Sequence, residues 1–203
     1  MPLLDDLYPS LKEEASDDVP IWQNPEKPWE VLSEGENGIM NQIIRITGSE
    51  EGVFIHPTAK IGDFVKIEGP CYIGPKAEVR HCALLRRGSW LCKGSLVGHS
   101  TEIKNSVLLP GSKAPHFNYV GDSILGSKVN LGAGAKISNV RNDKKIISVR
   151  SSNGSKIDTG MRKFGALIGD GSQLGCNVVT NPGVIIRPGS LISPNQTISG
   201  WNG

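Results

Sequence analysis

The chain has 203 residues, enough for one domain with an appendage, and its 22 basic and 20 acidic residues nearly cancel. This balance favours no polyanionic partner such as a nucleic acid. No apolar run approaches the roughly 20 residues that cross a membrane, and the first residues lack the pattern of a signal peptide. Only 5% of the residues are aromatic whereas 25 are Gly, which favours a narrow aliphatic core with tight corners.

The cysteine pattern favours a reducing compartment. The four cysteines are Cys71, Cys82, Cys92 and Cys176, and no two of them have a CxxC spacing. Nothing else marks an exported protein. We therefore predict a cytoplasmic protein whose cysteines are reduced thiols in or near the core.

Residues 1–50 are predicted to form a short helical N-terminal arm. A stripe of leucines from Leu3 to Leu11 is interrupted by Pro9, and prolines at 20, 25 and 28 then disfavour continuous helix. A second amphipathic stretch is expected from Pro28 to about Ile44. We expect the arm to pack on the end or side of the domain that follows and to cover an open edge. A separate functional module is the alternative.

From residue 55 an aliphatic residue recurs at every sixth position. The ten positions are Ile55, Ile61, Ile67, Ile73, Val79, Leu85, Leu91, Val97, Ile103 and Leu109. Neither a helix nor an ordinary strand has this period, which is the signature of a hexapeptide parallel β-helix. Three short strands would close one triangular coil of about 18 residues, with each aliphatic side chain in the bore. We therefore predict that residues 51–203 form an all-β solenoid.

The spacing between successive aliphatic residues then shortens from six residues to five at two steps. Leu108, Ala114 and Val120 continue one phase, and Leu125, Leu131 and Ile137 continue another. Ala114 stands where a large aliphatic is expected, beside Pro115 and His116. Because solenoids often place functional groups where the repeat is broken, we expect a site in this interruption.

From Asn139 to Lys163 the period is absent. Lys145–Arg150 and Ser155–Thr159 flank Asn153-Gly154, a dipeptide preferred in type I′ turns, so this basic excursion is predicted to contain a β-hairpin. The repeat resumes with Ile168, Leu174, Thr180, Ile186, Ile192 and Ile198. Trp201 is expected to close the last coil.

The histidines give no convincing metal motif. His81 and His99 are one coil apart and are expected to stack on one face, and His116 follows 17 residues later. A zinc site of three histidines between chains, as in the γ-class carbonic anhydrases, would need two ligands in a His-x4-His arrangement. The sequence has no such pair, and we predict no metal.

Two segments carry a more specific pattern. Residues 111–122 read GSKAPHFNYVGD and residues 129–134 read VNLGAG. They match the pattern GSKxxHxxYxGD, then VNxGAG, so that residues 51–203 resemble the C-terminal hexapeptide-repeat acetyltransferase domain of the bifunctional N-acetylglucosamine-1-phosphate uridylyltransferases, which are also glucosamine-1-phosphate acetyltransferases. The resemblance implies a left-handed β-helix, against the usual right-handed crossover rule, and a homotrimer with each site between adjacent β-helices.

The resemblance also implies acetyl-CoA-dependent N-acetylation of glucosamine or galactosamine 1-phosphate, which feeds the synthesis of nucleotide sugars such as UDP-N-acetylglucosamine. His116 would be the general base that deprotonates the attacking amine, since a base that titrates near pH 7 suits this task. Arg86 and Lys104 would hold the phosphate. Tyr119 and Asn130 would hydrogen-bond the sugar and its phosphate.

For the acetyl donor, the resemblance places Asn139 near the acetyl group and the Ala133 backbone near the thioester, where an N–H could stabilise an oxyanion. The family's stretch Cys-Asn-Tyr-Asp-Gly is replaced here by residues 138–142, SNVRN, which leaves the acceptor sugar open. Lys144 would replace the family's mobile lysine in binding the acceptor. The family's CoA-binding arginine falls near Pro194, so Arg187, or residues 162–163, would meet the CoA phosphates.

Other interpretations remain open at this point. Asn130 and Asn139 could be corner residues in the left-handed region, and Arg86 and Lys104 could be solvated cations. The chain could be a non-catalytic trimer that binds sugar phosphates or nucleotide sugars, or an acyltransferase for another amine. Because no Gly-rich nucleotide loop is present, uridylyl transfer is not expected, and a separate nucleotidyltransferase is a candidate partner.

Overall fold

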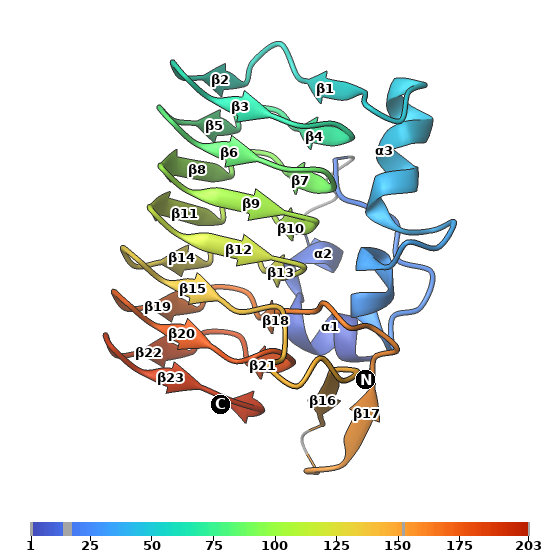
Figure 1. The fold of residues 1–203 in the computed structure, drawn as a ribbon, viewed down its shortest axis with the longest axis vertical. Coiled ribbons are helices and arrows are strands. Elements are labelled where there is room, and N and C mark those ends of the chain that lie inside the picture. Colours follow the sequence, from blue (N-terminus) through green and yellow to red (C-terminus); the bar gives the residue numbers. More distant parts are fainter. Residues whose placement is uncertain (1, 14–17, 152, 203) are drawn as a thin grey trace.

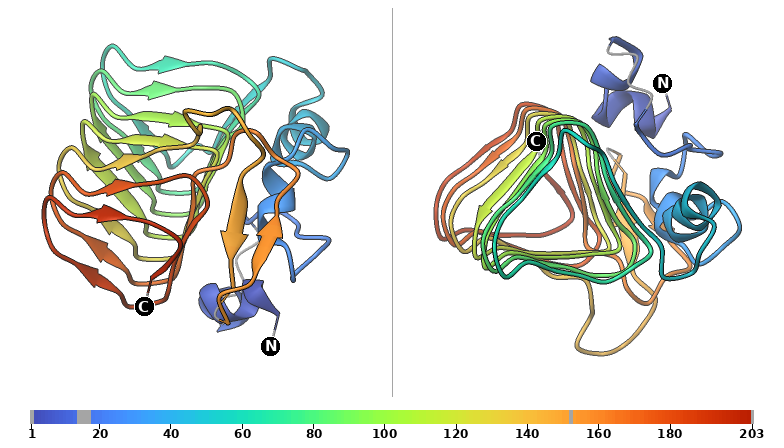
Figure 2. Two further views of the ribbon diagram at one scale, coloured as in Figure 1. Left: turned by 60° about the horizontal axis from the view of Figure 1, so that its bottom comes forward. Right: turned by 90° about the horizontal axis from the view of Figure 1, so that it is seen from above.

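The structure is a computed structural model that describes residues 2–13, 18–151 and 153–202. The chain winds as a triangular, left-handed solenoid of short parallel strands, with the helices along one of its sides (Figures 1 and 2). The predicted left-handed parallel β-helix with a helical N-terminal arm and a hairpin excursion is confirmed.

Successive coils add one strand to each of three parallel sheets, which we call sheets A, B and C in the order in which the chain visits them. Sheet A contains β1 (Val53–Ile55), β4 (Cys71–Ile73), β7 (Ser89–Leu91), β10 (Ser106–Leu108), β13 (Ile124–Leu125), β18 (Ala166–Ile168), β21 (Val184–Ile186) and β24 (Trp201–Asn202). Sheet B contains β2 (Lys60–Ile61), β5 (Glu78–Val79), β8 (Leu96–His99), β11 (Lys113–His116), β14 (Asn130–Leu131), β19 (Gln173–Leu174) and β22 (Leu191–Ile192). Sheet C contains β3 (Lys66–Ile67), β6 (Leu84–Leu85), β9 (Glu102–Lys104), β12 (Tyr119–Gly121), β15 (Lys136–Ile137), β20 (Val179–Thr180) and β23 (Thr197–Ile198).

The aliphatic row fills the bore as the period predicts. Ile73 pairs in register with Leu91, which pairs with Leu108, and all three side chains are fully buried. The first coil differs, because no earlier coil covers it: Ile55 and Ile61 are 43% and 39% exposed. The expectation for Leu109 is wrong, since Leu108 takes the bore position and Leu109 packs in the cluster outside.

The two shortened steps fall at one corner of the triangle, between sheets C and A. The register steps from Leu91 to Leu108 and from Leu108 to Leu125 are 17 residues, against 18 from Ile73 to Leu91. The shortened corners turn at Asn105 and Asp122, whose φ angles are 43° and 47°. Asn and Asp tolerate this left-handed conformation better than most residues. The interruption therefore lies at the Asn105 and Asp122 corners, and His116 lies at a different corner, between sheets B and C.

The arm consists of α1 (Leu3–Leu7), α2 (Ser10–Glu13), the 3₁₀ helix η1 (Pro28–Leu32) and α3 (Ile39–Thr47). The predicted break at Pro9 separates α1 from α2. The amphipathic stretch expected from Pro28 to about Ile44 is divided into η1 and α3, because the chain turns between Ser33 and Gly38. A side chain at Gly38 would clash with the Ser33 carbonyl oxygen, so the turn requires Gly at this position.

The arm packs on the side of the solenoid rather than on its end. The outer face of sheet A carries Phe54, Tyr72 and Trp90, whose rings stack at centroid distances of 4.9 and 4.5 Å. Trp29 and Ile43 of the arm are buried in the same cluster. Figure 2 shows the helices against this single side, seen from above. The arm therefore covers the apolar outer face of sheet A.

The hairpin and the last strand follow the prediction with two differences. β16 (Ser148–Arg150) and β17 (Lys156–Asp158) are antiparallel, but the Ser151 N–H donates to the Ser155 carbonyl at 2.9 Å, so the tip is longer than a two-residue turn. Trp201 lies in β24, which extends sheet A by pairing with β21. It packs against the cluster outside sheet A and does not close the bore.

All four cysteines are free thiols, but only Cys71 and Cys92 are buried. Cys82 and Cys176 are exposed, so the expectation that all four lie in or near the core holds for half of them. Within the described ranges, no helix has the length and apolar character needed to cross a bilayer.

Candidate functional site

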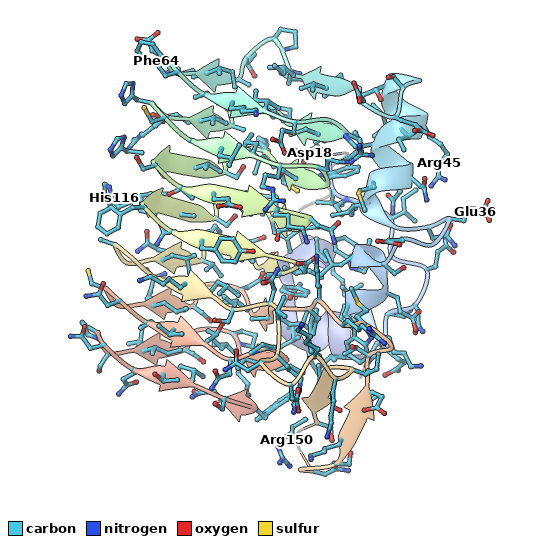
Figure 3. The ribbon with its side chains drawn as sticks, viewed as in Figure 1. Asp18, Glu36, Arg45, Phe64, His116 and Arg150 are labelled. Atoms are coloured by element: carbon cyan, nitrogen blue, oxygen red, sulfur yellow. The ribbon has the colours of Figure 1, made fainter. Side chains whose placement is uncertain are left out.

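His116 is an exposed side chain at the corner between sheets B and C. It ends β11 and pairs in register with His99 of β8, and the rings of His81 and His99 stack at 5.6 Å. The predicted stacking of His81 and His99 is confirmed. Figure 3 shows His116 at the edge of the solenoid opposite the arm.

The backbone around His116 is fixed by a buried amide. The Asn118 side chain is 3% exposed; its Oδ1 accepts the His116 N–H at 3.0 Å, and its Nδ2 donates to the Gly132 carbonyl at 2.7 Å. Asn118 therefore ties the His116 corner to the coil below. A fixed backbone reduces the number of directions in which the imidazole can point, which suits a positioned base.

Ala133 occupies the same corner one coil further along. The Gly134 N–H donates to the His116 carbonyl at 3.0 Å, which places residues 133 and 134 directly beside His116. Among the described residues no acceptor pairs with the Ala133 N–H, so this donor is available to a ligand. The predicted role of Ala133 at the thioester stays a prediction.

Tyr119, Lys104 and Arg86 lie on the outer face of sheet C. Tyr119 begins β12, and Lys104 ends the neighbouring strand β9. The Arg86 Nη1 donates to Glu102 at 2.9 Å. Burial and, after it, the negative charges of Asp122 and Glu102 raise the pKa of Tyr119, so its hydroxyl keeps its proton.

Asp122 is the centre of a buried polar network behind these residues. Its carboxylate accepts hydrogen bonds from the Lys104 Nζ at 2.9 Å, from the Asn105 Nδ2 at 2.9 Å and from the Asn139 amide. Asp122 and Asn139 are 2% and 8% exposed. The Asn139 amide and the Tyr119 hydroxyl also pass over Gly121, where any side chain would clash with them.

The structure bears on two of the alternative interpretations. Neither Asn130 nor Asn139 is among the residues with positive φ, so neither is a left-handed corner residue. Lys104 is 20% exposed and pairs with the buried Asp122, whereas Arg86 pairs with Glu102 but keeps 41% of its side chain exposed, so the interpretation of Arg86 as a solvated cation stays open.

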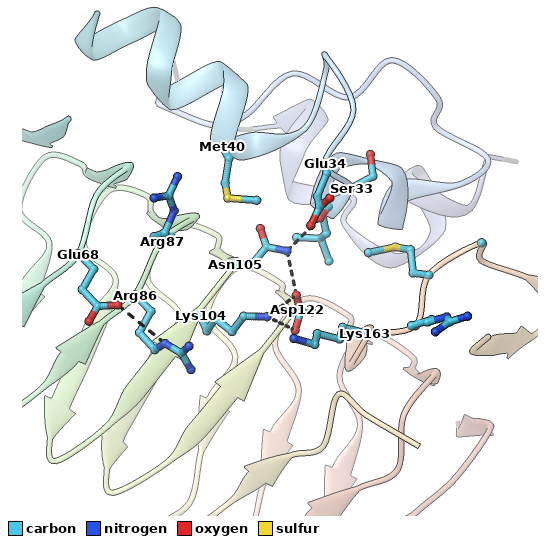
Figure 4. Close-up of a pocket in the computed structure, with 14 residues that line it drawn as sticks. Ser33, Glu34, Met40, Glu68, Arg86, Arg87, Lys104, Asn105, Asp122 and Lys163 are labelled. Atoms are coloured by element: carbon cyan, nitrogen blue, oxygen red, sulfur yellow. Dashed lines mark hydrogen bonds and ion pairs between the residues drawn. The ribbon is translucent and has the colours of Figure 1, made fainter. Parts of the chain in front are cut away.

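A pocket of about 610 Å³ lies where the solenoid corner between sheets C and A meets the arm and the end of the excursion (Figure 4). The excursion returns to this corner because the Gly165 N–H donates to the Asp122 carbonyl at 2.8 Å. The lining comprises Leu32, Ser33, Glu34 and Met40 from the arm, Glu68, Arg86, Arg87, Lys104, Asn105 and Asp122 from the solenoid, and Gly160, Met161, Arg162 and Lys163 from the excursion. Both predicted phosphate ligands therefore face one cavity, in which cations outnumber carboxylates.

The other predicted residues lie elsewhere in the chain. Asn130 begins β14 of sheet B, around the His116 corner from Tyr119. Lys144 follows a turn of the excursion in which its N–H donates to the Arg141 carbonyl. Arg187 follows β21 and lines a different pocket, with Leu7 of α1 and Trp201. Asn130 and Arg187 therefore lie on other sides of the solenoid than Lys104 and Arg86.

Sequence reasoning missed Asn105, Asp122 and Arg87. The two five-residue steps in the aliphatic row, from Ile103 to Leu108 and from Val120 to Leu125, were the signal that could have found the first two. No comparable signal exists for the arm residues of the pocket, because their place depends on how the arm docks. In the part of the chain that the structure describes, no group of three or more His, Cys, Asp or Glu side chains could hold a metal ion.

Fold and site together define a solenoid of the hexapeptide-repeat class. The model of the family described as the GMPPB C-terminal domain matches residues 67–200, and the chain belongs to this family.

Three curated proteins are similar to this chain in sequence. A bifunctional sugar-1-phosphate nucleotidylyltransferase/acetyltransferase from Sulfurisphaera tokodaii is 35% identical over 183 residues, 81% of this chain. The bifunctional protein GlmU of Methanocaldococcus jannaschii is 34% identical over 198 residues, 90% of this chain, so its match reaches into the arm. An uncharacterized acetyltransferase, YaiX, from Escherichia coli is 35% identical over 148 residues, covering 73% of this chain and 64% of YaiX. The predicted resemblance to hexapeptide-repeat acetyltransferases is confirmed.

The chain spans 43% and 47% of the first two of these relatives. Among solved structures, the acetyltransferase domain of PglB from Neisseria gonorrhoeae is 18% identical, with a TM-score of 0.40 over 81% of this chain and 61% of that one.

Proposed function

We propose that this chain is an acetyl-CoA-dependent N-acetyltransferase whose acceptor is a hexosamine 1-phosphate, glucosamine or galactosamine 1-phosphate. The observation that carries the proposal is the arrangement on sheet C, where the exposed His116 at one edge and the pair Arg86 and Lys104 near the other flank Tyr119. This arrangement offers a base at one end of a face and an anion site at the other.

Arg86 and Lys104 would hold the phosphate of the acceptor. Both face the pocket, and their carboxylate partners Glu102 and Asp122 keep the two cations in place before the ligand arrives. A guanidinium binds phosphate through a planar pair of N–H groups, whereas an ammonium acts as a compact charge, so the two complement each other. The protonated Tyr119 hydroxyl can donate to a sugar or phosphate oxygen.

His116 would take the proton of the attacking amine. As the amine nitrogen forms its bond to the thioester carbonyl carbon, one N–H proton passes to the imidazole. The carbon–sulfur bond then breaks, and the CoA thiolate leaves and is protonated to the thiol. The Ala133 N–H, which has no acceptor in the described chain, lies beside His116 and would stabilise the oxyanion formed between these steps. Asn139 would act near the acetyl group.

The site would be completed by a second copy in a homotrimer. Asn130 lies on sheet B and Tyr119 on sheet C of the same chain, on the two faces that meet at His116. If sheet C of one copy faced sheet B of the next, Asn130 of that copy would reach the acceptor. Arg187, which follows a strand of sheet A, would then contact the CoA phosphates in the assembly, and Lys144 would contact the acceptor.

The test is an acceptor panel with purified protein. Acetyl-CoA is combined in turn with glucosamine 1-phosphate, galactosamine 1-phosphate and the unphosphorylated amino sugars, and free CoA thiol is followed. We expect turnover with a phosphorylated hexosamine and at least about 10-fold less without the phosphate, because one well-held charged group contributes more than 1.4 kcal/mol.

A second outcome would support another function. Binding of a hexosamine phosphate by calorimetry without any release of CoA would indicate a non-catalytic sugar-phosphate-binding protein. Release of CoA only with unrelated amines would indicate an acyltransferase of a different acceptor class. Either result would overturn the proposal.

A further inference from the structure

The pocket between solenoid, arm and excursion is larger and more cationic than a single sugar phosphate requires. Its volume of about 610 Å³ falls in the range of roughly 300–1,000 Å³ that is typical of sites for drug-sized ligands. The arm and the excursion form two of its walls. These walls lie beyond Arg86 and Lys104, the residues that the proposed function uses.

The cations of the pocket fall into two groups. Arg86 and Lys104 are each paired with a carboxylate of the solenoid. Arg87, Arg162 and Lys163 also line the pocket, and among the described residues none of the three has an ion-pair partner. Figure 4 shows Arg87 pointing toward α3 of the arm and Lys163 pointing toward Asp122 from the excursion side.

Unpaired like charges around one cavity repel each other, and a bound anion would remove this cost. A single phosphate at Arg86 and Lys104 would leave Arg87 without an anion, whereas Lys163 points toward the carboxylate of Asp122, which already pairs with Lys104. A second phosphate, bonded to the first, would lie next to Arg87 and Lys163. A diphosphate therefore spreads its negative charge over more of the cations that line the pocket than a monophosphate does.

The remaining wall suits a nucleoside. Leu32, Met40 and Met161 present apolar surface, and Met side chains adapt their shape to flat rings. Ser33 and Glu34 lie on the same side, and an acidic side chain is a common acceptor for ribose hydroxyls. All but Met161 belong to the arm, so the arm supplies most of this wall.

We propose that this pocket binds a nucleoside diphosphate, so that the chain takes its amino sugar in nucleotide-linked form. The sugar-side phosphate lies at Arg86 and Lys104, the second phosphate at Arg87 and Lys163, and the nucleoside on the Met40 wall. The identity of the sugar as an acetyl acceptor rests on the proposed function above, whereas the diphosphate site rests on the pocket alone.

The test is calorimetric binding of UDP, GDP and UMP to the whole chain without acetyl-CoA. We expect at least one diphosphate to bind at least about 10-fold more tightly than UMP. Arg87→Ala and Lys163→Ala should each weaken diphosphate binding about 10-fold, the loss that corresponds to 1.4 kcal/mol. Arg150→Ala, which removes an exposed arginine of the hairpin far from the pocket, is the matched control and should leave the affinity unchanged.

The same protein then receives acetyl-CoA with UDP-glucosamine or glucosamine 1-phosphate, and kcat/KM is compared. A value at least about 10-fold higher for the nucleotide-linked sugar supports the inference. If a diphosphate binds and Arg87→Ala weakens this binding, but no acceptor is acetylated, the assignment of the pocket stands and the proposed function is wrong. If glucosamine 1-phosphate is acetylated but no diphosphate binds, the inference is wrong and the proposed function stands. The same holds if a diphosphate binds and neither Arg87→Ala nor Lys163→Ala weakens its binding.

Discussion

At the residue scale, Asp122 connects the fold to the candidate site. It forms a tight corner with φ of 47°, and its buried carboxylate holds Lys104, Asn105 and Asn139. The same side chain thus forms a corner of a coil and holds Lys104, which the proposed function assigns to the phosphate. A residue with both tasks is expected to be sensitive in stability as well as in binding.

Replacing Asp122 by Ala should lower the free energy of unfolding by about 2–4 kcal/mol, because the Lys104 ammonium and two amide donors lose their acceptor in a largely buried place. Urea unfolding followed by circular dichroism measures the change. Asp63→Ala removes an exposed carboxylate from the first coil and should change the free energy by less than about 0.5 kcal/mol. Equal losses in the two variants would contradict the role given to Asp122.

In the proposed function, Asn118 would act on catalysis only through the position of His116. Asn118→Ala removes the acceptor of the His116 N–H and the donor to the Gly132 carbonyl. We expect kcat to fall about 10-fold or more, since misplacing a catalytic base is costly, while KM for the phosphorylated acceptor stays close to that of wild type. A rise of KM with unchanged kcat would show that Asn118 serves the acceptor site instead.

How much of the site could be predicted differs from residue to residue. The motif at residues 111–134 predicted roles for His116, Tyr119 and Ala133, because a fixed motif preserves local spacing. Asn105 and Asp122 could not be assigned a role in this way, since their partners come from neighbouring coils and from the excursion. The unpaired cation Arg87 depends on the docking of the arm, which no spacing in the sequence encodes.

At the element scale, the aliphatic period predicted the solenoid because each bore position repeats one simple requirement, an apolar side chain at a fixed step. The period could not give the place of the arm. That place is set by the apolar outer face of sheet A, where Tyr72 and Trp90 stack, and the sequence does not mark these residues as outward-facing. The same limit explains why Leu109, an apparent member of the row, packs outside.

Two isoleucines of α3 test whether the arm is an integral part of the fold. Ile43 is fully buried against the solenoid, whereas Ile46, three residues later, is 48% exposed. Ile43→Ala should lower the free energy of unfolding by about 2–5 kcal/mol because it leaves a cavity, and Ile46→Ala should change it by less than about 1 kcal/mol. A single transition by chemical unfolding is expected for both; similar effects of the two variants would contradict the packing of the arm.

At the scale of the whole molecule, burial predicts a loss of stability in alkali. Burial raises the pKa of the Cys71 thiol to about 12 and raises that of the Tyr8 hydroxyl well above its usual 10.0. In the unfolded chain both groups ionise near their ordinary values, so the unfolded state gains on the folded state once the pH exceeds about 9. The free energy of unfolding should therefore be steady below pH 9 and fall between about 9 and 12. A flat profile up to pH 11 would contradict the burial of these groups.

The assembly proposed here makes a further prediction about mixed subunits. His116→Ala and Asn130→Ala homotrimers should each be inactive, because each lacks one side of every site. Co-expressing the two variants should restore CoA release to at least about a tenth of the wild-type rate, since some interfaces then pair an intact His116 with an intact Asn130. Activity that stays at the level of the single variants would place both residues in a site of one chain.

The central claim is that this solenoid transfers an acetyl group with His116 as the base. The most direct measurement is the rate of CoA release with a hexosamine phosphate acceptor, in nucleotide-linked or free form, for wild type, His116→Ala and His56→Ala. His56 is a half-buried histidine of the first coil whose ring hydrogen-bonds the Thr58 hydroxyl. Loss of the base should reduce kcat by about 10²–10⁴-fold in His116→Ala and leave His56→Ala at the wild-type rate. Wild-type turnover in His116→Ala would contradict the account.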